Sequence, residues 1–236
     1  MNKYLQETDL LDVSNKRIQN LIKEKKWNTL GKFECIKSIY NFVRDEILFG
    51  YNSDDKITAS KVLKDGFGQC NTKGILFMAL LRACNIPCRI HGFTIDKKLQ
   101  KGAMSGIVYK NAPSSIFHSW VEVFYNGTWF ELEGFILDVF YLNKLQNLFN
   151  ECNGSFCGYG VAVKDFKNPI IDFNENNTYI QSEGINRDFG IYDSPDELLK
   201  EHHQEISFIK KIAYRYIGRH IMNLNIKRIR NGSMPI

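Results

Sequence analysis

Cys70 is the residue of this sequence that is best placed for covalent chemistry. It follows a tight turn with glycines at positions 66 and 68, and it precedes an apolar run that is stopped by Asn85 and Pro87. The run predicts a buried helix that begins at Cys70, where unpaired N–H groups and the helix dipole stabilise a thiolate. A lone cysteine on an apolar helix is more commonly an inert core residue, so a base must also be found.

A histidine and a carboxylate lie on a predicted hairpin further along the chain. Residues 117–125 alternate in polarity, and an Asn-Gly pair, the strongest short hairpin signal, separates them from a return strand at 128–132. A two-residue turn then pairs Trp120 with Glu133, so Glu133 shares a face with His118, one diagonal step away. A carboxylate in that position orients an imidazole, and an oriented imidazole is the base that a thiol nucleophile needs.

Other residues could complete such a site. Asp138 is the alternative third member of a triad, although a continued strand would turn it to the face opposite His118. Gln69 and the backbone N–H of Cys70 are candidates for holding an oxyanion, and Trp120 could either wall the cleft or belong to the core. The same hairpin register places Glu122 opposite Glu131, which is unfavourable unless both are solvated, and a bulge would shift every pair by one.

The elements that must position these residues begin with helices. Apolar residues at helical spacing occupy the first third of the chain, a short helix is expected at 59–63, and the buried helix follows at about 70–84. Residues 88–95 then form a strand, and residues 97–115 form a flexible loop that we interpret as a lid over the cleft. In the hairpin, we expect the face with Ser119, Val121 and Val123 to be the buried one.

The second half of the chain is less regular. A helix is expected at 138–150, whereas the segment 151–190 has no pattern that assigns it to helix or strand. A capping box at Ser194 starts a helix or a broken pair of helices that runs to about residue 222, followed by a basic tail. The order of elements predicts an α+β fold, in which a central helix packs on an antiparallel sheet and helices flank it at both ends.

Several of these motifs, in the same order, resemble the transglutaminase-like superfamily of papain-related cysteine enzymes. In that family the cysteine opens the central helix, the histidine follows in an H-x-W-x-E-like strand, and an aspartate on the next strand comes after a tryptophan. The resemblance covers about residues 35–140 and rests on Phe42-Val43-Arg44-Asp45, Gly68-Gln69-Cys70, residues 79–89, His118-Ser119-Trp120-Val121-Glu122-Val123, Trp129 and Leu132-Glu133.

The resemblance implies a papain-like or transglutaminase-like core with Cys70 as nucleophile and His118 as base. The aspartate position of the family falls on Glu133, which has the same charge and one more methylene. The expected reaction is acyl transfer from an amide, through a thioester on Cys70, to water, as in a peptidase or amidase. A transglutaminase-type transfer to an amine is the alternative, and a non-catalytic binding module that keeps the cleft is a third possibility. The expected partner is a peptide or small amide.

Composition limits the remaining classes. The 236 residues carry a formal net charge of +5, and no apolar run is long enough to span a membrane. The N-terminus lacks the pattern of a secretory signal, so we expect a cytoplasmic protein. We expect a single domain over residues 1–236, with a helical extension at about 190–230. The basic residues of that extension could bind an anionic surface, but a nucleic-acid partner is not expected.

The cysteines of a cytoplasmic protein are expected to be free thiols. A zinc site would need four thiolates, which the sequence offers only as two separate pairs. One of these pairs should be split between a helix end and a strand start. We therefore expect neither a metal nor a cofactor. The six cysteines are Cys35, Cys70, Cys84, Cys88, Cys152 and Cys157.

Overall fold

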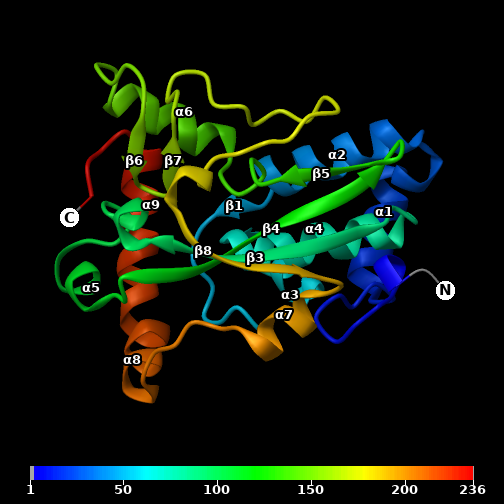
Figure 1. Cartoon of the computed structure of the whole chain (residues 1–236), viewed down its shortest axis with the longest axis horizontal. Helices are drawn as coiled ribbons and strands as arrows, with labels where there is room; N and C mark the ends of the chain where they lie inside the picture. The colour runs from blue at the N-terminus through cyan, green and yellow to red at the C-terminus, as the bar shows by residue number, and fades with distance from the viewer. Residues whose placement is uncertain (1–2, 236) are drawn as a thin grey trace.

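A four-stranded antiparallel sheet forms the centre of the computed structural model, which describes residues 3–235 (Figure 1). Its strands lie in the order β5-β4-β3-β8. They are β3 (Cys88–Asp96), β4 (Ser115–Tyr125), β5 (Thr128–Leu132) and β8 (Ile185–Tyr192). Helices lie around this sheet, so the predicted α+β class is confirmed. None of the helices in the described part of the chain combines the length and apolarity needed to cross a membrane.

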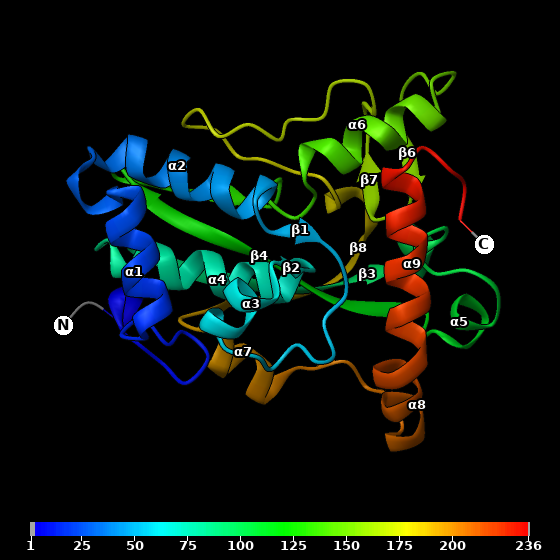
Figure 2. The ribbon, with the colours of Figure 1, turned by 180° about the vertical axis from the view of Figure 1, so that it is seen from behind.

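Helix α4 (Cys70–Ala83) packs on the sheet. Figure 2 shows this arrangement from the side opposite to Figure 1. Every residue from Cys70 to Arg82 is buried, as expected for a helix that is apolar on most sides. Around it lie α1 (Lys16–Lys25), α2 (Lys32–Asp45) and α3 (Ala59–Asp65). The helices predicted for the first third of the chain, at 59–63 and at 70–84 are thereby confirmed.

The hairpin of β4 and β5 has the predicted register. Val121 pairs with Leu132, Val123 with Phe130 and Tyr125 with Thr128. The turn residues Asn126 and Gly127 both have positive φ angles, 49° and 82°, as a tight two-residue hairpin turn requires.

Glu122 and Glu131 lie opposite each other in this register, as predicted. Glu122 bonds Arg89 and His91, and Glu131 accepts the hydroxyl of Tyr179. Separate polar partners therefore offset the repulsion between the two carboxylates.

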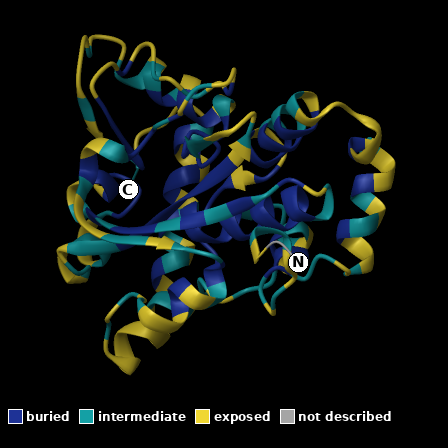
Figure 3. Ribbon diagram, turned by 45° about the vertical axis from the view of Figure 1, so that its right-hand side comes forward, coloured by how far each residue is buried: buried dark blue, intermediate teal, exposed yellow. Residues whose placement is uncertain are grey.

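The face of β4 with Ser119, Val121 and Val123 is buried, as predicted. The sequence did not indicate that the opposite face, with His118, Trp120 and Glu122, is buried as well. Trp120 packs between Phe93 and Tyr179, and Tyr179 belongs to the segment 151–190 that the sequence left unassigned. A distant part of the chain thus covers the second face. Figure 3 shows the middle of the fold in dark blue, the colour of buried residues.

The unassigned segment and its neighbours contain regular structure. It provides the hairpin of β6 (Phe156–Gly158) and β7 (Val161–Val163), the 3-10 turn Ser182–Gly184 and most of β8. The loop 97–115 contains a 3-10 turn (Lys97–Gln100) and α5 (Gly106–Asn111). The remaining elements are η1 (Lys3–Leu5), η2 (Trp27–Thr29), the parallel pair β1 (Leu48–Phe49) and β2 (Phe67–Gly68), α6 (Val139–Leu148) and α7 (Pro195–Glu201).

The C-terminal helices extend further than predicted. α8 (Phe208–Ala213) continues through a π-helical turn (Tyr214–Gly218) into α9 (Arg219–Arg230), eight residues beyond the expected end near 222. α9 crosses one end of the sheet and packs on α6 (Figures 1 and 2). Its buried residues Met222, Ile226 and Ile229 belong to the main hydrophobic core, so this extension is part of the same packed interior.

A lysine is completely buried in that interior. Lys73 on α4 donates from Nζ to the carbonyl oxygens of Arg44, at 3.1 Å, and Ile136, at 2.9 Å. Burial lowers the pKa of Lys73 to about 7, because the charged form is poorly solvated. Between this value and the ordinary lysine pKa of about 10.4, the unfolded chain binds more protons than the folded one, so this group makes the folded state more stable as pH rises.

We expect the free energy of unfolding of the wild type, minus that of Lys73→Met, to increase between pH 7 and pH 10. The increase can reach about 1.4 kcal/mol per pH unit, because one proton is involved. Urea denaturation at three pH values measures it. Other titrating groups are common to both proteins and cancel in the difference, so a pH-independent difference would contradict the prediction.

Candidate active site

The start of α4 is fixed by its own first turn. Gln69, the residue before the helix, donates its backbone N–H to Thr72 Oγ1 at 3.0 Å. A Cβ at Gly68 would lie only 2.6 Å from the same oxygen, so this turn and cap require glycine. Cys70 is therefore held at the first helical position with its side chain 8% exposed, where the free N–H groups of the first turn are available to a negative charge.

His118 and Glu133 are brought together as predicted from the hairpin. His118 Nε2 lies 2.7 Å from Glu133 Oε1, and both side chains are fully buried. The second carboxylate oxygen, Oε2, accepts the backbone N–H groups of Ile180 and Gln181, each at 2.8 Å. Three donors on one buried carboxylate fix its position and favour its ionised form.

The other imidazole nitrogen, Nδ1, has no hydrogen-bond partner among the described residues. Burial alone would lower the pKa of His118, but the neighbouring Cys70 side chain and then Glu133 raise it to about 10. Cys70 therefore lies near enough to interact strongly with the ring. Since Nε2 is held by Glu133, Nδ1 is the nitrogen available to exchange a proton with the Cys70 sulfur.

Gln69 and Trp120, the two further candidates, lie on different sides of these groups. The Gln69 amide accepts the backbone N–H of Asn52 at 2.9 Å and donates to Asp55 at 3.0 Å. It thus holds the loop 51–55 and lines a cavity next to Cys70. Trp120 packs in a cluster of aromatic rings with Phe93 and Tyr179, where it supports the strand that carries His118.

Asp138, the alternative third member, lies elsewhere. One oxygen of its carboxylate accepts the N–H of Tyr141 at 2.8 Å and caps α6. The other accepts the N–H of Phe49 at 2.9 Å and forms an ion pair with Arg230 on α9. The structure therefore places Asp138 as a link between α6, β1 and α9, and gives His118 a different carboxylate.

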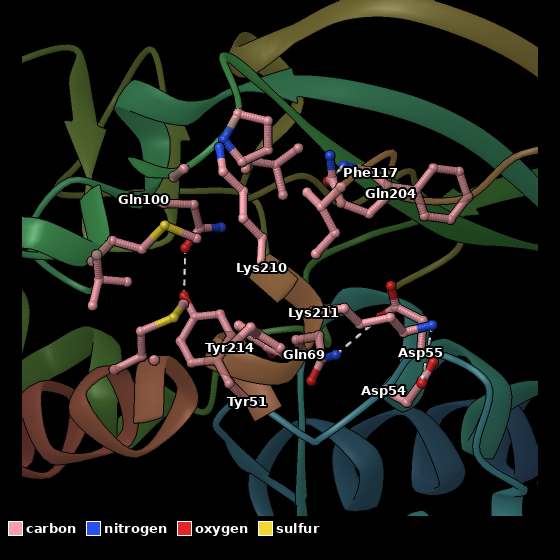
Figure 4. A pocket seen from close by; sticks show the side chains of 18 of the residues that line it. Tyr51, Asp54, Asp55, Gln69, Gln100, Phe117, Gln204, Lys210, Lys211 and Tyr214 are labelled. Carbon is pink, nitrogen blue, oxygen red and sulfur yellow. Dashed lines mark hydrogen bonds and ion pairs between the residues drawn. The ribbon is translucent and has the colours of Figure 1, made fainter. Parts of the chain in front are cut away.

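A cavity of about 710 Å³ extends from Cys70 (Figure 4). Figure 4 shows Gln100 and Tyr51 on one side, Gln69 and Asp55 on another, and Lys210, Lys211 and Tyr214 from the C-terminal helices. The sequence analysis did not assign Tyr51, Gln100 or Gln181 to the site. The apolar side of the C-terminal helix was a visible signal for a buried surface, but its partner could not be inferred from spacing.

The family model that describes the transglutaminase-like superfamily matches residues 19–134. This matched segment, the transglutaminase-like core, covers just under half of the chain. The matched segment contains Cys70 and His118 and ends one residue after Glu133. The match to this family supports a thiol-dependent enzyme. Ile180, Gln181 and the C-terminal helices lie outside the matched segment.

Two solved structures are similar to parts of this chain. A protein from Cytophaga hutchinsonii, assigned as a candidate cysteine protease, is 14% identical with a TM-score of 0.46, covering 82% of this chain and 47% of its own. Red sea bream transglutaminase is 16% identical with a TM-score of 0.33, covering 56% of this chain and 27% of its own. The chain thus spans about half of the first protein and about a quarter of the second. No curated protein matches the sequence.

Proposed function

We propose that the protein is a cysteine hydrolase that cleaves an amide through a thioester on Cys70. The observation that supports this most is the position of His118. Its Nε2 lies 2.7 Å from a buried carboxylate that accepts three hydrogen bonds. Its Nδ1 remains free beside the nucleophile at the start of α4. This arrangement has the three roles that thiol catalysis needs: nucleophile, base and a group that orients the base.

The mechanism uses groups of this chain alone. The Cys70 thiolate attacks the amide carbonyl, and the N–H groups of the first turn of α4 stabilise the oxyanion. His118 then donates the proton on Nδ1 to the leaving amine, which leaves an acyl group on Cys70. In the second half, neutral His118 takes a proton from water, and the resulting hydroxide equivalent releases the acid. Glu133 keeps a proton on Nε2 throughout, so that Nδ1 always faces the reaction.

Acylation by 4-nitrophenyl acetate tests this proposal, because an acetyl group is small enough for any shape of cleft. Mass spectrometry should find an acetyl group on Cys70. Nitrophenolate release should continue, because water hydrolyses the acetyl thioester and regenerates the thiol. Cys70→Ala should show neither. A protein that carries no acetyl group on Cys70 would instead be a binding module that keeps the cleft.

The acceptor is decided by a second trial in which a glutamine-containing peptide is mixed with a labelled primary amine. We expect release of ammonia without incorporation of label. Incorporation of the amine would overturn hydrolysis in favour of a transglutaminase-type transfer, while leaving the thioester mechanism in place. Cys70→Ala serves as the blank in both trials.

A further inference from the structure

The cavity beside Cys70 has a wall that the transglutaminase-like core does not supply. The wall comes from the segment before α8, from α8, from the π-helical turn and from α9, all outside residues 19–134. Polar residues on this wall are His203, Gln204, Lys210, Lys211 and Tyr214, and Gly218 also lines it. Six apolar side chains make up the rest. They are Ile206, Ile209, Ala213, Ile217, Ile221 and Met222.

The opposite wall is mostly apolar, with Gln100 and Asn111 as its polar residues. It is formed by the end of β3, by the segment that includes α5, and by the start of β4. At the mouth, Ile107, Ile209 and Ile217 line the cavity although they are 74%, 78% and 61% exposed. Apolar side chains thus continue from the surface to the nucleophile. The residues of this wall are Ile95, Met104, Ile107, Val108, Ile116 and Phe117.

Most polar side chains around the cavity already have partners within the protein. Lys210 donates to the backbone carbonyl of Asn111, and Lys211 forms an ion pair with Asp54. Tyr51 donates its hydroxyl to Gln100, and the Gln69 amide is held by Asn52 and Asp55. The hydroxyl of Tyr214 donates to a backbone carbonyl at 3.0 Å. Figure 4 draws the Tyr51–Gln100 and Gln69–Asp55 hydrogen bonds. A buried peptide would bring one N–H and one C=O for almost every residue, and these walls offer it few partners.

One buried acceptor remains beside the triad. Gln181 lines the cavity and is 1% exposed, and its Oε1 has no hydrogen-bond partner within residues 3–235. Its backbone N–H is one of the two that hold Glu133, so Gln181 is directly hydrogen-bonded to the proposed triad. An unpaired buried oxygen is costly unless a ligand satisfies it. A substrate with a single amide N–H and an otherwise apolar body matches this inventory.

We propose that the cavity binds the hydrocarbon chain of an N-acyl amide, with the carbonyl at Cys70 and the amide N–H directed to Gln181. The proposal rests on the proposed function, because it names the substrate class of the same site. The Cys70 sulfur forms a bond to the acyl carbon, the C–N bond breaks, and the amine leaves with a proton from His118. Water then cleaves the thioester and yields the fatty acid and the free thiol.

A chain-length series of N-acyl-4-nitroanilides tests the proposal with the full-length protein. We expect kcat/KM to rise about fourfold per methylene, the value for a methylene moved from water into an apolar site. The rise should level off when the chain fills the cavity. Release of nitroaniline is read by absorbance, and hydrolysis of the same series by free cysteine corrects for intrinsic reactivity.

Two substitutions on the cavity wall have a matched control outside it. Ile221→Gln should lower kcat/KM for a dodecanoyl substrate about tenfold, because a buried amide lacks partners there, and leave the acetyl substrate unchanged. Leu224→Gln, on the same helix but not on the wall, should change neither. Ile217→Gln repeats the test at a position 61% exposed, where loss of folding is not expected, and circular dichroism verifies the fold of all three.

Binding is measured separately from catalysis. Cys70→Ala should bind a dansyl-labelled undecanoic acid saturably, and dodecanoate should displace it. Binding without turnover of any anilide would uphold the hydrocarbon site and overturn the proposed hydrolase. Turnover that is independent of chain length, together with no binding, would overturn the hydrocarbon site and leave the hydrolase standing.

Discussion

Cys70 should be the first cysteine of the native protein to react with iodoacetamide at pH 6. An ordinary thiol, with a pKa of about 8.5, is only about 0.3% thiolate at that pH. Cys70 and Glu133 raise the pKa of His118 to about 10. We therefore expect an imidazolium beside Cys70 at pH 6, and an imidazolium stabilises a thiolate. His118→Ala removes this partner, and we expect the alkylation rate of Cys70 at pH 6 to fall about 100-fold.

Cys157 is the internal control for this measurement. It is the exposed cysteine of the chain, whereas Cys70 is only 8% exposed, so accessibility alone would favour Cys157. Partial burial raises the pKa of Cys157. Mass spectrometry of the labelled peptides from pH 5 to pH 9 separates the two sites. Equal labelling of both cysteines at pH 6, or an unchanged Cys70 rate in His118→Ala, would show that the nucleophile is not activated.

Glu133→Gln should lower kcat/KM of the proposed reaction by about 10² to 10⁴. The N–H groups of Ile180 and Gln181 both point at one oxygen of the present carboxylate. A glutamine there must turn its own oxygen to these donors, so its NH₂ group faces His118 Nε2. The ring then carries its proton on Nδ1, next to Cys70, and can no longer accept the thiol proton.

Glu133→Asp is the informative companion, because aspartate is the residue that the resemblance to the family leads one to expect. Its side chain is one methylene shorter and cannot reach both His118 and the backbone of residues 180–181 without a shift of the strand. We therefore expect a loss of about tenfold rather than a gain. Activity of Glu133→Gln within threefold of the wild type would contradict the role of Glu133, and the folded state of both variants is checked by thermal unfolding.

The parts of the site that could be predicted are those that follow from local rules. The apolar run after Cys70 has one regular solution, a buried helix that begins at the thiol. The Asn-Gly turn fixes the strand register, and the register places Glu133 near His118. Each inference needs only residues that are close in sequence or joined by a tight turn.

The parts that could not be predicted depend on distant segments. The donors that hold Glu133 come from residues 180 and 181, in a region without helical or strand periodicity. Burial of the His118 face depends on Tyr179 from the same region. Asp138 was a reasonable alternative by sequence position, but Arg230 lies 92 residues away and still engages it. The spacing of residues along the chain does not predict such contacts between distant segments.

In the proposed enzyme, Gln181 has two roles that different atoms perform: its backbone N–H holds Glu133, and its side chain lines the substrate cavity. Its contribution to the triad is made by a backbone N–H, which every residue but proline has, and its contribution to the cavity is made by a side chain. Any substitution other than proline keeps the backbone N–H that Glu133 accepts and changes the side chain that faces the cavity. The wall on α8 and α9 has the same freedom, since it lies outside the segment that carries Cys70, His118 and Glu133. Selection could therefore change the substrate of the proposed enzyme without changing its proposed nucleophile, base and orienting carboxylate.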